Sequence, residues 1–346
     1  MRRAGALAAK ILAALVALLV VVAVVPALLF TRAHAWRTPH PFTGAKVCNP
    51  YEATNGAIAT TGPGPHWFRA NFHTHSSAWE GKQPPCDVVA AYHKLGYEVA
   101  EVSDHGVISD TSSCNPEYIP TYEHGANARS VHFTVIDAKA VQPDRYPLWV
   151  GLAQKQDTID RLKSDGSYVV VNHPCHNHGF FPGEFQWLEG YDAVDVQGHF
   201  CKDSSFWDSA LTAGVAAWCF SGDDVHDVTT PATGARYVYV HAASTSRADV
   251  LAALRAGTFV CGFRLDEATE PFVPFPTALT VSAGTISLTI ARPAKTIRWI
   301  AEGGAILRED RDTDHATFPM GAHSYIRVEA QTGSQRAYFQ PVRRCD

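Results

Sequence analysis

The sequence predicts an α/β barrel with a small antiparallel β appendage after it and one apolar helix before it, on three observations. Between residues 67 and 265, short apolar runs alternate with helical stretches at the spacing of parallel βα units. After about Phe275, apolar and polar residues alternate and no helical pattern returns, which is typical of antiparallel strands. Residues 11–30 form an uninterrupted apolar run.

Residues 1–35 are expected to lie outside the fold. Three basic residues come first, and the apolar run that follows would make a helix of about 30 Å, long enough to cross a bilayer. The basic head should stay in the cytoplasm, which places the rest of the chain on the other side of the membrane. Residues 33–35, Ala-His-Ala, also fit a signal peptidase site, so both a retained membrane anchor and a cleaved signal peptide remain open.

Composition limits what the remaining chain can be. With 46% hydrophobic residues in a chain of 346, a large core can form, and general disorder is excluded. The net charge is −5, and removing the four basic side chains of residues 1–35 leaves −9 for the rest. A surface that acidic disfavours nucleic acid as a partner.

The domain organisation follows from these patterns. Residues 36–65 are rich in Pro, Gly and Thr and are expected to be a linker. The barrel should occupy 66–270 and the β-rich subdomain 275–346. Strands are predicted at 68–72, 98–102, 131–136, 168–171, 193–196, 216–220 and 237–240. Helices are predicted at 86–95, 154–163, 205–211 and 247–255, and short strands of the appendage at 279–281, 287–290, 297–300, 325–328 and 337–340.

All eight cysteines lie beyond the leader. An even number in an exported chain indicates disulfides, although eight cysteines allow 105 pairings and the sequence does not choose among them. Buried free thiols are the alternative. Because no Cys-x-x-Cys occurs, a zinc ribbon or a thioredoxin-like motif is disfavoured.

Metal-type ligands stand where several predicted strands end. The chain has 17 histidines, an excess for a side chain that binds metals and carries protons. The motifs are His73-Thr74-His75, Ser103-Asp104-His105, Asn172-His173-Pro174 and Gly222-Asp223-Asp224-Val225-His226, with Glu123 and His132 between the second and the third. Each motif alone is weak, since exposed histidines or a hydrogen-bonded Asp-His turn would look the same. In a barrel the strand ends converge on one face, and together they predict one shared metal site.

In this order, the motifs resemble the PHP (polymerase and histidinol phosphatase) superfamily, over about residues 67–265. Past it, residues 297–304, 325–329 and 337–341 resemble the tail of the carbaryl-hydrolase-like branch, which the Asp-Asp-x-His form of the last motif also suits. The resemblance implies a distorted (β/α)7 TIM-like barrel and a site for two or three divalent metal ions. Histidine-rich N/O ligation suits Zn²⁺, Mn²⁺ or Fe²⁺.

The resemblance also implies a ligand set. The first metal would be held by His73, His75, Glu123 and Asp224. Glu123 would bridge to a second metal, completed by His132 and His173. A third would be held by Glu80, His105 and His226.

Some positions in this set stay open. Glu80 stands where the family usually has Asp, which bears on whether the third position is filled. Glu117 competes with Glu123 for the bridging role, because the loop 109–122 has no firm register. Asp104 and Asp223 are expected to orient ligands.

Four side chains are expected to take part in catalysis: Asp224, His226, His176 and His178. His176 and His178 follow His173 in one loop, where they would contact the substrate or protonate the leaving group; a plain polar loop is the alternative. His199 is a weaker candidate at the mouth of the barrel, and His93 is expected to be a surface residue of a helix.

The function predicted from these residues is metal-dependent ester hydrolysis outside the cytoplasm. Water held between metal ions has its pKa lowered towards about 7 and would attack small phosphate esters, while the ions stabilise the charge that develops. Cleavage of carboxylic or carbamate esters is the alternative within hydrolases, and an exported metal-binding protein without catalysis is the alternative outside them. The expected partners are a small anionic ester and, if the leader is retained, the membrane.

Overall fold

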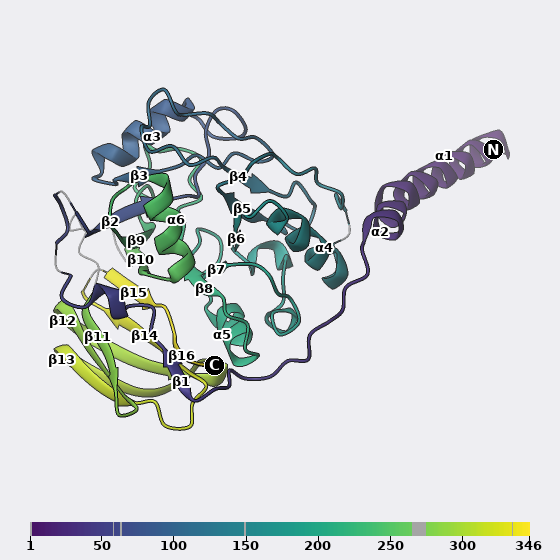
Figure 1. Ribbon diagram of the computed structural model, residues 1–346. Helices are drawn as coiled ribbons and strands as arrows, with labels where there is room; N and C mark the ends of the chain where they lie inside the picture. The colour runs from purple at the N-terminus through teal and green to yellow at the C-terminus, as the bar shows by residue number, and fades with distance from the viewer. Residues whose placement is uncertain (1, 58, 63, 149, 265–274, 334) are drawn as a thin grey trace.

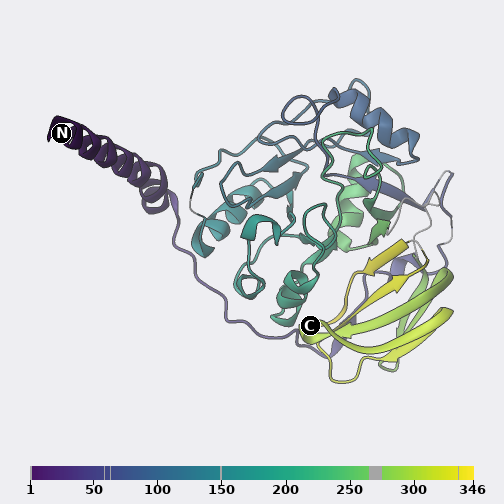
Figure 2. The ribbon, with the colours of Figure 1, turned by 180° about the vertical axis from the view of Figure 1, so that it is seen from behind.

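The computed structural model describes residues 2–57, 59–62, 64–148, 150–264, 275–333 and 335–346 (Figure 1). The described strands form two sheets of a mixed α/β fold, one with five strands and one with eleven. The apolar N-terminal segment is helical and projects away from this body in both views (Figures 1 and 2). It consists of α1 (Arg2–Leu19), a π-helical turn over Val20–Val24 and α2 (Val25–Phe30).

Length and composition make this helix a candidate for crossing a membrane. The stretch Ala6–Phe30 has a mean hydropathy of 3.1 and none of it is buried against the body. A helix of this kind near an N-terminus is equally typical of a signal sequence. It is therefore compatible with both of the predictions made for the leader.

The five-stranded sheet has the order β4 (Thr121–His124), β5 (Phe133–Ile136), β6 (Tyr168–Val171), β7 (Ala193–Asp195) and β8 (Trp218–Phe220). Strands β6, β7 and β8 are parallel, as βα units require, with α4 (Leu152–Lys163) before β6 and α5 (Ser205–Thr212) before β8. Strand β5 runs antiparallel to both of its neighbours. The run Tyr168–Val171 is buried throughout, which explains why its pattern is apolar rather than alternating.

The larger sheet begins with β3 (Val99–Ala100), β2 (His66–Asn71), β9 (Arg236–Ala242) and β10 (Phe259–Arg264). It continues through β15 (Gln335–Phe339), β14 (Tyr325–Gln331), β16 (Val342–Cys345) and β1 (Lys46–Cys48). Strands β11 (Pro276–Ser282), β12 (Thr285–Ala301) and β13 (Ala305–Pro319) extend it beside β14. The antiparallel C-terminal strands thus continue the sheet that carries β2. Figure 1 shows them gathered at one side of the body.

The helices associated with this sheet are α3 (Pro85–Lys94) and α6 (Arg247–Ala256). Helix α6 shows why its boundaries fall where they do. The Ser246 side chain accepts a hydrogen bond from the Asp249 backbone N–H and caps the first turn. Gly257 ends the helix with φ at 75°, a left-handed conformation that favours glycine.

A closed TIM-like barrel is not confirmed. The two sheets are not closed into one ring. Their ends are joined by two isolated parallel bridges, one between Thr74 and Val225 and one between His105 and Glu123. The antiparallel pairing of β9 and β10 beside β2 carries the larger sheet outward into the C-terminal strands, while single bridges alone join the ends of β2 and β3 to the smaller sheet among the described residues. Both bridges involve the strand-end motifs, so the metal-type ligands lie where the two sheets meet.

The helices at 86–95, 154–163, 205–211 and 247–255 are present within two residues of their predicted ends. The strands that were not predicted are β1, β4, β10, β13 and β16. The predicted strands 287–290 and 297–300 are both parts of β12, which has 17 residues. The proposed domain boundaries remain a prediction. Within 36–65, which we expected to serve as a linker, the described residues include β1, which pairs with β16, and the fully buried Tyr51.

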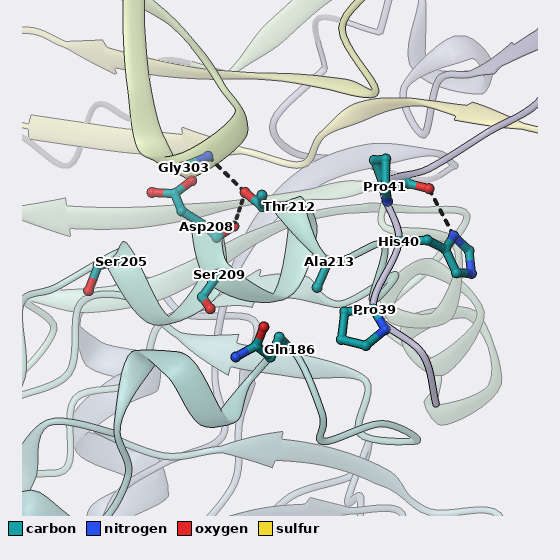
Figure 3. Close-up of a pocket in the computed structure, with 10 residues that line it drawn as sticks. All are labelled: Pro39, His40, Pro41, Gln186, Ser205, Asp208, Ser209, Thr212, Ala213 and Gly303. Atoms are coloured by element: carbon teal, nitrogen blue, oxygen red, sulfur yellow. Dashed lines mark hydrogen bonds between the residues drawn. The ribbon is translucent and has the colours of Figure 1, made fainter. Parts of the chain in front are cut away.

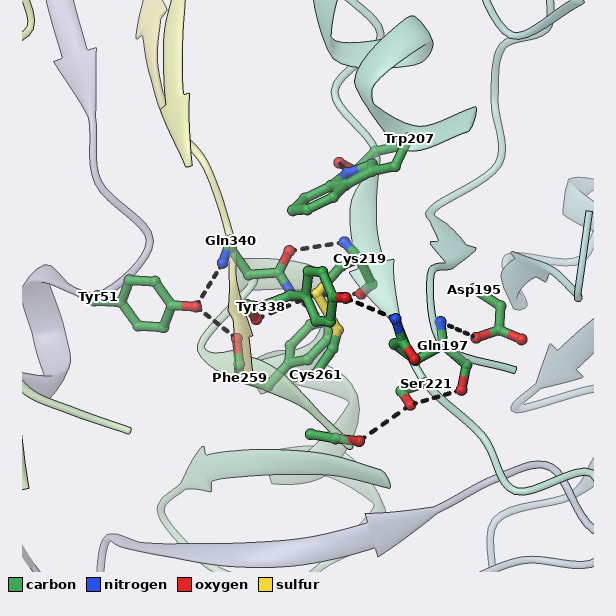
Figure 4. The surroundings of a disulfide bond; sticks show 12 residues. Tyr51, Asp195, Gln197, Trp207, Cys219, Ser221, Phe259, Cys261, Tyr338 and Gln340 are labelled. Atoms are coloured by element: carbon green, nitrogen blue, oxygen red, sulfur yellow. Dashed lines mark hydrogen bonds between the residues drawn. A yellow bond between two sulfur atoms is a disulfide. The ribbon is translucent and has the colours of Figure 1, made fainter. Parts of the chain in front are cut away.

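Four disulfides confirm the interpretation of the cysteines. They join Cys48 to Cys345, Cys86 to Cys114, Cys175 to Cys201 and Cys219 to Cys261. The last is fully buried and connects β8 to β10, across the boundary between the two sheets. Figure 4 shows Gln340 beside it, donating to the backbone carbonyl of Cys219 and accepting from its N–H.

Candidate metal centre

Loops that leave the strand ends bring the predicted ligands together. His73 and His75 follow β2 in extended backbone, so their rings point to the same side of the chain. The backbone N–H of Asp224 donates to the His73 carbonyl at 2.8 Å, and that of His75 donates to the Val225 carbonyl at 2.9 Å. Asp224 has φ at 51°, in the left-handed region. These contacts lock the loop after β8 against the loop after β2.

The first group of ligands consists of His73, His75, Glu123 and Asp224, whose ligand atoms lie within 4.8 Å of one another. His75 Nε2 is 3.1 Å from Asp224 Oδ1 and 3.2 Å from Glu123 Oε2. His73 Nε2 is 3.2 Å from the same Glu123 oxygen. All four side chains are buried. This is the first-metal set that the resemblance implies.

Glu123 also belongs to a second group, with His105 and His132. His105 Nε2 lies 3.2 Å from Glu123 Oε2, and His132 Nδ1 lies 3.3 Å from Glu123 Oε1. His173 Nε2 is 3.3 Å from the same Oε1. Five imidazoles therefore surround one carboxylate that is only 1% exposed. Glu123 holds a position between two sets of ligands, while Glu117 belongs to none of the groups found among the described residues.

The third group joins His75 with Glu80 and His226. Glu80 Oε1 is 3.1 Å from His226 Nε2 and 3.5 Å from His105 Nε2. The Glu80 side chain is 48% exposed, against 1% for Glu123. This group contains His75 where the predicted set had His105, and it lies at the open edge of the centre; whether it holds a third metal ion stays a prediction.

The electrostatics of the centre suit a cation. Burial lowers the pKa of His75, but hydrogen bonds to Asp224 and Glu123 outweigh it and raise the pKa to about 10. Burial raises the pKa of Glu123, but the neighbouring His73 and His132 hold it well below its usual range. The pKa of Asp224 is likewise lowered, against its burial, by His73 and His75. Both carboxylates therefore stay ionised, and they attract positive charge into a buried space.

Unpaired atoms provide a further test of whether metal ions fit. Among the described residues, Glu123 Oε2 is buried without a well-formed hydrogen bond, although the Nε2 atoms of His73, His75 and His105 all lie 3.2 Å from it. Such orphan atoms are costly unless something else satisfies them. Burial lowers the pKa of His105 to about 4, which keeps that ring neutral and able to donate a lone pair. A donor set of imidazoles and carboxylates fits divalent ions such as Zn²⁺, Mn²⁺ or Fe²⁺.

Polar residues beside the ligands hold them in place. Asp223 accepts hydrogen bonds from the Tyr92 hydroxyl and from the backbone N–H of Arg236, which anchors the loop that carries Asp224. Asp104 accepts from the Ser76 hydroxyl and backbone N–H, next to His75. These contacts are those expected of residues that orient ligands.

Two residues of this kind were missed by sequence reasoning. Asn172 donates from Nδ2 to Glu123 Oε1 at 2.8 Å and accepts from the Thr134 hydroxyl at 2.9 Å, so it positions the central carboxylate. Asp195 ends β7, is buried, and accepts from the His173 backbone N–H at 3.3 Å. Burial raises the pKa of Asp195 to about 6. The sequence feature that could have identified Asp195 is a carboxylate near the end of the predicted strand 193–196.

The remaining candidate histidines lie at the edge of the centre. His176 is half-buried, with its ring 5.4 Å from that of His173 and 4.4 Å from that of Phe200. His178 is exposed and stacks on Phe181, and it joins none of the ligand groups found in the described part of the chain. The disulfide between Cys175 and Cys201 ties this turn to the loop after β7. The structure thus places His176 nearer to the ligands than His178, and their catalytic roles stay predictions.

His199, the weaker candidate, is exposed beside a buried cation. Its Nδ1 is 3.5 Å from Arg236 Nη1. Burial lowers the pKa of His199 and the charge of Arg236 lowers it further, while Asp224 acts in the opposite direction. Arg236 is 6% exposed, and its Nε is buried without a hydrogen-bond partner. A buried positive group therefore stands beside His199, the weaker candidate at the mouth of the centre.

No family model matches this chain, and no curated protein matches it. Among solved structures, it is similar to a two-domain protein from Bacteroides vulgatus that contains a predicted PHP-like metal-dependent phosphoesterase. That likeness has 15% identity and a TM-score of 0.46, and it covers 88% of this chain and 91% of the other.

A proposed metal-dependent phosphoesterase from Bifidobacterium adolescentis is similar at 14% identity and a TM-score of 0.35, over 54% of this chain and 96% of the other. Because both identities and both TM-scores are low, the chemistry of the centre has to be inferred from the residues of this chain.

Proposed function

We propose that this chain is a metal-dependent hydrolase of the PHP superfamily, in its carbaryl-hydrolase-like branch, and that it cleaves small phosphate esters outside the cytoplasm. The observation that carries the proposal is the sharing of ligands between groups. Glu123 belongs to two groups and His75 to two, so the three sets form one continuous centre. Bridging carboxylates of this kind are typical of sites with two or more metals that act on ester bonds.

The metal ions would supply an activated water and stabilise the charge that develops on the ester oxygens. The residues of the chain have separate tasks. The buried carboxylates of Glu123 and Asp224 stay ionised and hold the centre together. His226 and His176, both half-buried, stand at its open edge, where a substrate would enter. There they are placed to bind the ester or to give a proton to the leaving group.

An anionic substrate is favoured by Arg236. Its guanidinium is buried, yet among the described residues it forms no ion pair with a carboxylate; its neighbours are His199 and the ring of Phe263, 5.4 Å away. The Lys202 ammonium lies 5.4 Å from the same ring. Because no carboxylate lies within ion-pair distance of this guanidinium in the described part of the chain, an arriving phosphate would supply the direct partner that this position lacks. A neutral carboxylic or carbamate ester would not.

The first test is an assay of the purified full chain with Mn²⁺ or Zn²⁺. The substrates are para-nitrophenyl phosphate, bis-para-nitrophenyl phosphate and para-nitrophenyl acetate. We expect turnover of a phosphate ester, and we expect His73→Ala and Asp224→Ala to abolish it and to lower the metal content. His315→Ala, on an exposed position of β13, is the matched control and should match the wild type. Tight metal binding without cleavage of any ester would support a binding protein instead.

Arg236→Met separates the two ester classes. A charge-assisted hydrogen bond contributes about 1.5–3 kcal/mol, so kcat/KM for the phosphate ester should fall by about 10- to 100-fold. Turnover of the acetate ester, if any, should stay within about twofold, because that substrate has no charge to pair. Equal losses on both substrates would show that Arg236 supports the fold rather than the anion.

A further inference from the structure

The segment between the apolar helix and the body is held down along its length. Residues 31–42, which we call the strap, have no regular secondary structure. At their start, the Thr31 hydroxyl accepts from Gln154 Nε2 at 3.0 Å, and the Arg32 backbone N–H donates to Asp157 Oδ1 at 3.3 Å. Both partners lie on the first turns of α4. The end of the helix is thus attached directly to the body.

The middle of the strap is bound as well. The ring nitrogens of His34 lie 3.5 Å from Asp160 and 3.4 Å from Glu189. The Arg37 guanidinium donates to two backbone carbonyls, those of Gln186 at 2.9 Å and Ala213 at 2.7 Å. A side chain that ties two loops together in this way restrains the chain that carries it.

The last part of the strap packs against α5. The His40 backbone N–H donates to the Ala213 carbonyl at 3.3 Å, and Phe42 is buried in the core at 8% exposure. Pro39, His40 and Pro41 form one wall of a cavity of about 450 Å³ against this helix (Figure 3). The strap is therefore part of the folded body, and the helix leaves the body at a defined place.

These contacts bear on the fate of the leader. Cleavage after Ala35 would remove Thr31, Arg32 and His34, and with them every contact made by the first part of the strap. A segment destined for removal has no need of hydrogen bonds to the mature domain. The geometry favours a helix that stays attached and anchors the protein.

The helix leaves the body at the same end as the metal centre. Helix α4 runs back to the start of β6, and β6 ends just before His173. The first turn of α4, which binds Thr31 and Arg32, therefore lies at the level where β6 delivers His173 to the centre. In both views α2 lies close to α4 (Figures 1 and 2).

The loops that carry Arg145 and Arg129 lie between the helix exit and the centre, and they meet where the Ala128 backbone N–H donates to the Pro147 carbonyl at 3.0 Å. The Arg145 guanidinium lies 5.3 Å from the Phe30 ring. Arg129, in the loop that leads to His132, donates from Nη2 to the His178 carbonyl at 2.8 Å. We call Arg129, Arg145, Leu148 and Phe181 the rim. Leu148 is 38% exposed and Phe181 51% exposed.

The rim combines exposed apolar side chains with unpaired positive charge. Within the described part of the chain, neither Arg129 nor Arg145 forms an ion pair with a carboxylate. Basic and apolar groups side by side next to a membrane-spanning segment are typical of surfaces that rest on anionic lipid headgroups. Because the body as a whole carries the opposite charge, −9 for residues 36–346, only a local positive surface such as the rim can be attracted to anionic lipid.

We propose that the strap holds the rim against an anionic bilayer, so that the metal centre works beside the membrane surface. The occupant of the rim is the phosphate-bearing lipid surface itself. This proposal does not depend on hydrolysis, since contact with lipid is measured without a substrate.

The experiment uses the full chain in nanodiscs, with phosphatidylcholine alone or with about 30% phosphatidylglycerol. Amide hydrogen exchange is followed in peptides that cover 126–131 and 178–183. We expect exchange to be slower in the anionic discs, and Arg129→Glu with Arg145→Glu to remove the difference. Each charge near a lipid surface is expected to change the protection by about fivefold. Lys46→Glu with Lys295→Glu reverses two exposed charges near the C-terminal strands and is the matched control.

Arg37→Ala tests the strap separately, since it leaves both rim arginines intact. We expect protection of the rim in anionic discs to fall towards its value in neutral discs, because the body is no longer held in one orientation. Equal exchange in both kinds of disc, or a control double variant that behaves like the rim variant, would overturn the proposal. So would an N-terminus at Trp36 in the protein isolated from membranes.

Discussion

Glu123 is the residue whose replacement tests the centre most directly. Its carboxylate is 1% exposed and lies within 3.3 Å of the rings of five histidines, which are His73, His75, His105, His132 and His173. Glu123→Gln keeps the size of the side chain and its bond from Asn172, but removes the negative charge that two ligand groups share. We therefore expect the variant to fold and to lose metal.

The size of the effect follows from burial. Removing one partner of a buried charged set costs about 3–5 kcal/mol. At about 1.4 kcal/mol per tenfold change, the dissociation constant of the metal should rise by about 10²- to 10⁴-fold. A surface carboxylate would lose far less, because water screens its charge.

The assay is metal content measured by elemental analysis after dialysis against graded chelator, with circular dichroism to confirm the fold. Glu117→Gln is the matched control, since the sequence proposed Glu117 for the same role and the structure places it outside the ligand groups found in its described part. If Glu123→Gln kept the metal content and affinity of the wild type, the bridging role would be refuted. A loss of equal size in Glu117→Gln would refute it too.

Three further predictions concern stability. Replacing both Cys219 and Cys261 by Ala should lower the free energy of unfolding by about 4 kcal/mol, from the loop of 42 residues that they close, as measured by urea denaturation. Tyr51→Phe should cost about 1–3 kcal/mol in the same assay, because the buried Tyr51 hydroxyl donates to one backbone carbonyl and accepts from one backbone N–H (Figure 4). Burial raises the pKa of Glu302, but hydrogen bonds from its neighbours outweigh it and hold the pKa at about 2, below the ordinary 4.5. The wild type should therefore exceed Glu302→Gln in Tm above about pH 5, and this advantage should fade between pH 4.5 and 2; a difference independent of pH would contradict the assignment.

Local patterns were enough for the helices and for most strands of the first part of the chain. Tyr168–Val171 is an apolar run closed by a proline three residues later, and its boundaries were predicted without error. Strand β10 was missed because its residues 259–264 include Cys261 and Gly262 and show no clear alternation, although a predicted helix precedes them. The pairing of β10 with β15 depends on residues more than 70 positions away, which no local pattern contains.

The ligand residues could be predicted from the sequence because few types of side chain bind divalent metal ions. Histidines spaced by one residue at the end of a strand share a side of the chain, as His73 and His75 do, and this needs no tertiary information. The choice between Glu117 and Glu123 was different. It depends on how the loop 109–122 folds, and that loop is held by contacts from elsewhere, such as the Ile119 N–H to the Glu101 carboxylate at 2.9 Å.

By itself, the sequence determined the types of residue that can bind metal and the apolar leader, because both are properties of composition and short-range spacing. Its even number of cysteines indicated disulfides but left free thiols as an alternative. The tertiary structure alone decided which carboxylate lies among five imidazoles, which cysteines pair, and that β2 continues into the C-terminal strands instead of closing a barrel. It also decided that the strap is bound to α4 and α5. These features depend on contacts between residues far apart in the chain. Several arrangements fit the local sequence pattern equally well, and the one that buries apolar side chains and pairs the polar groups is the most stable.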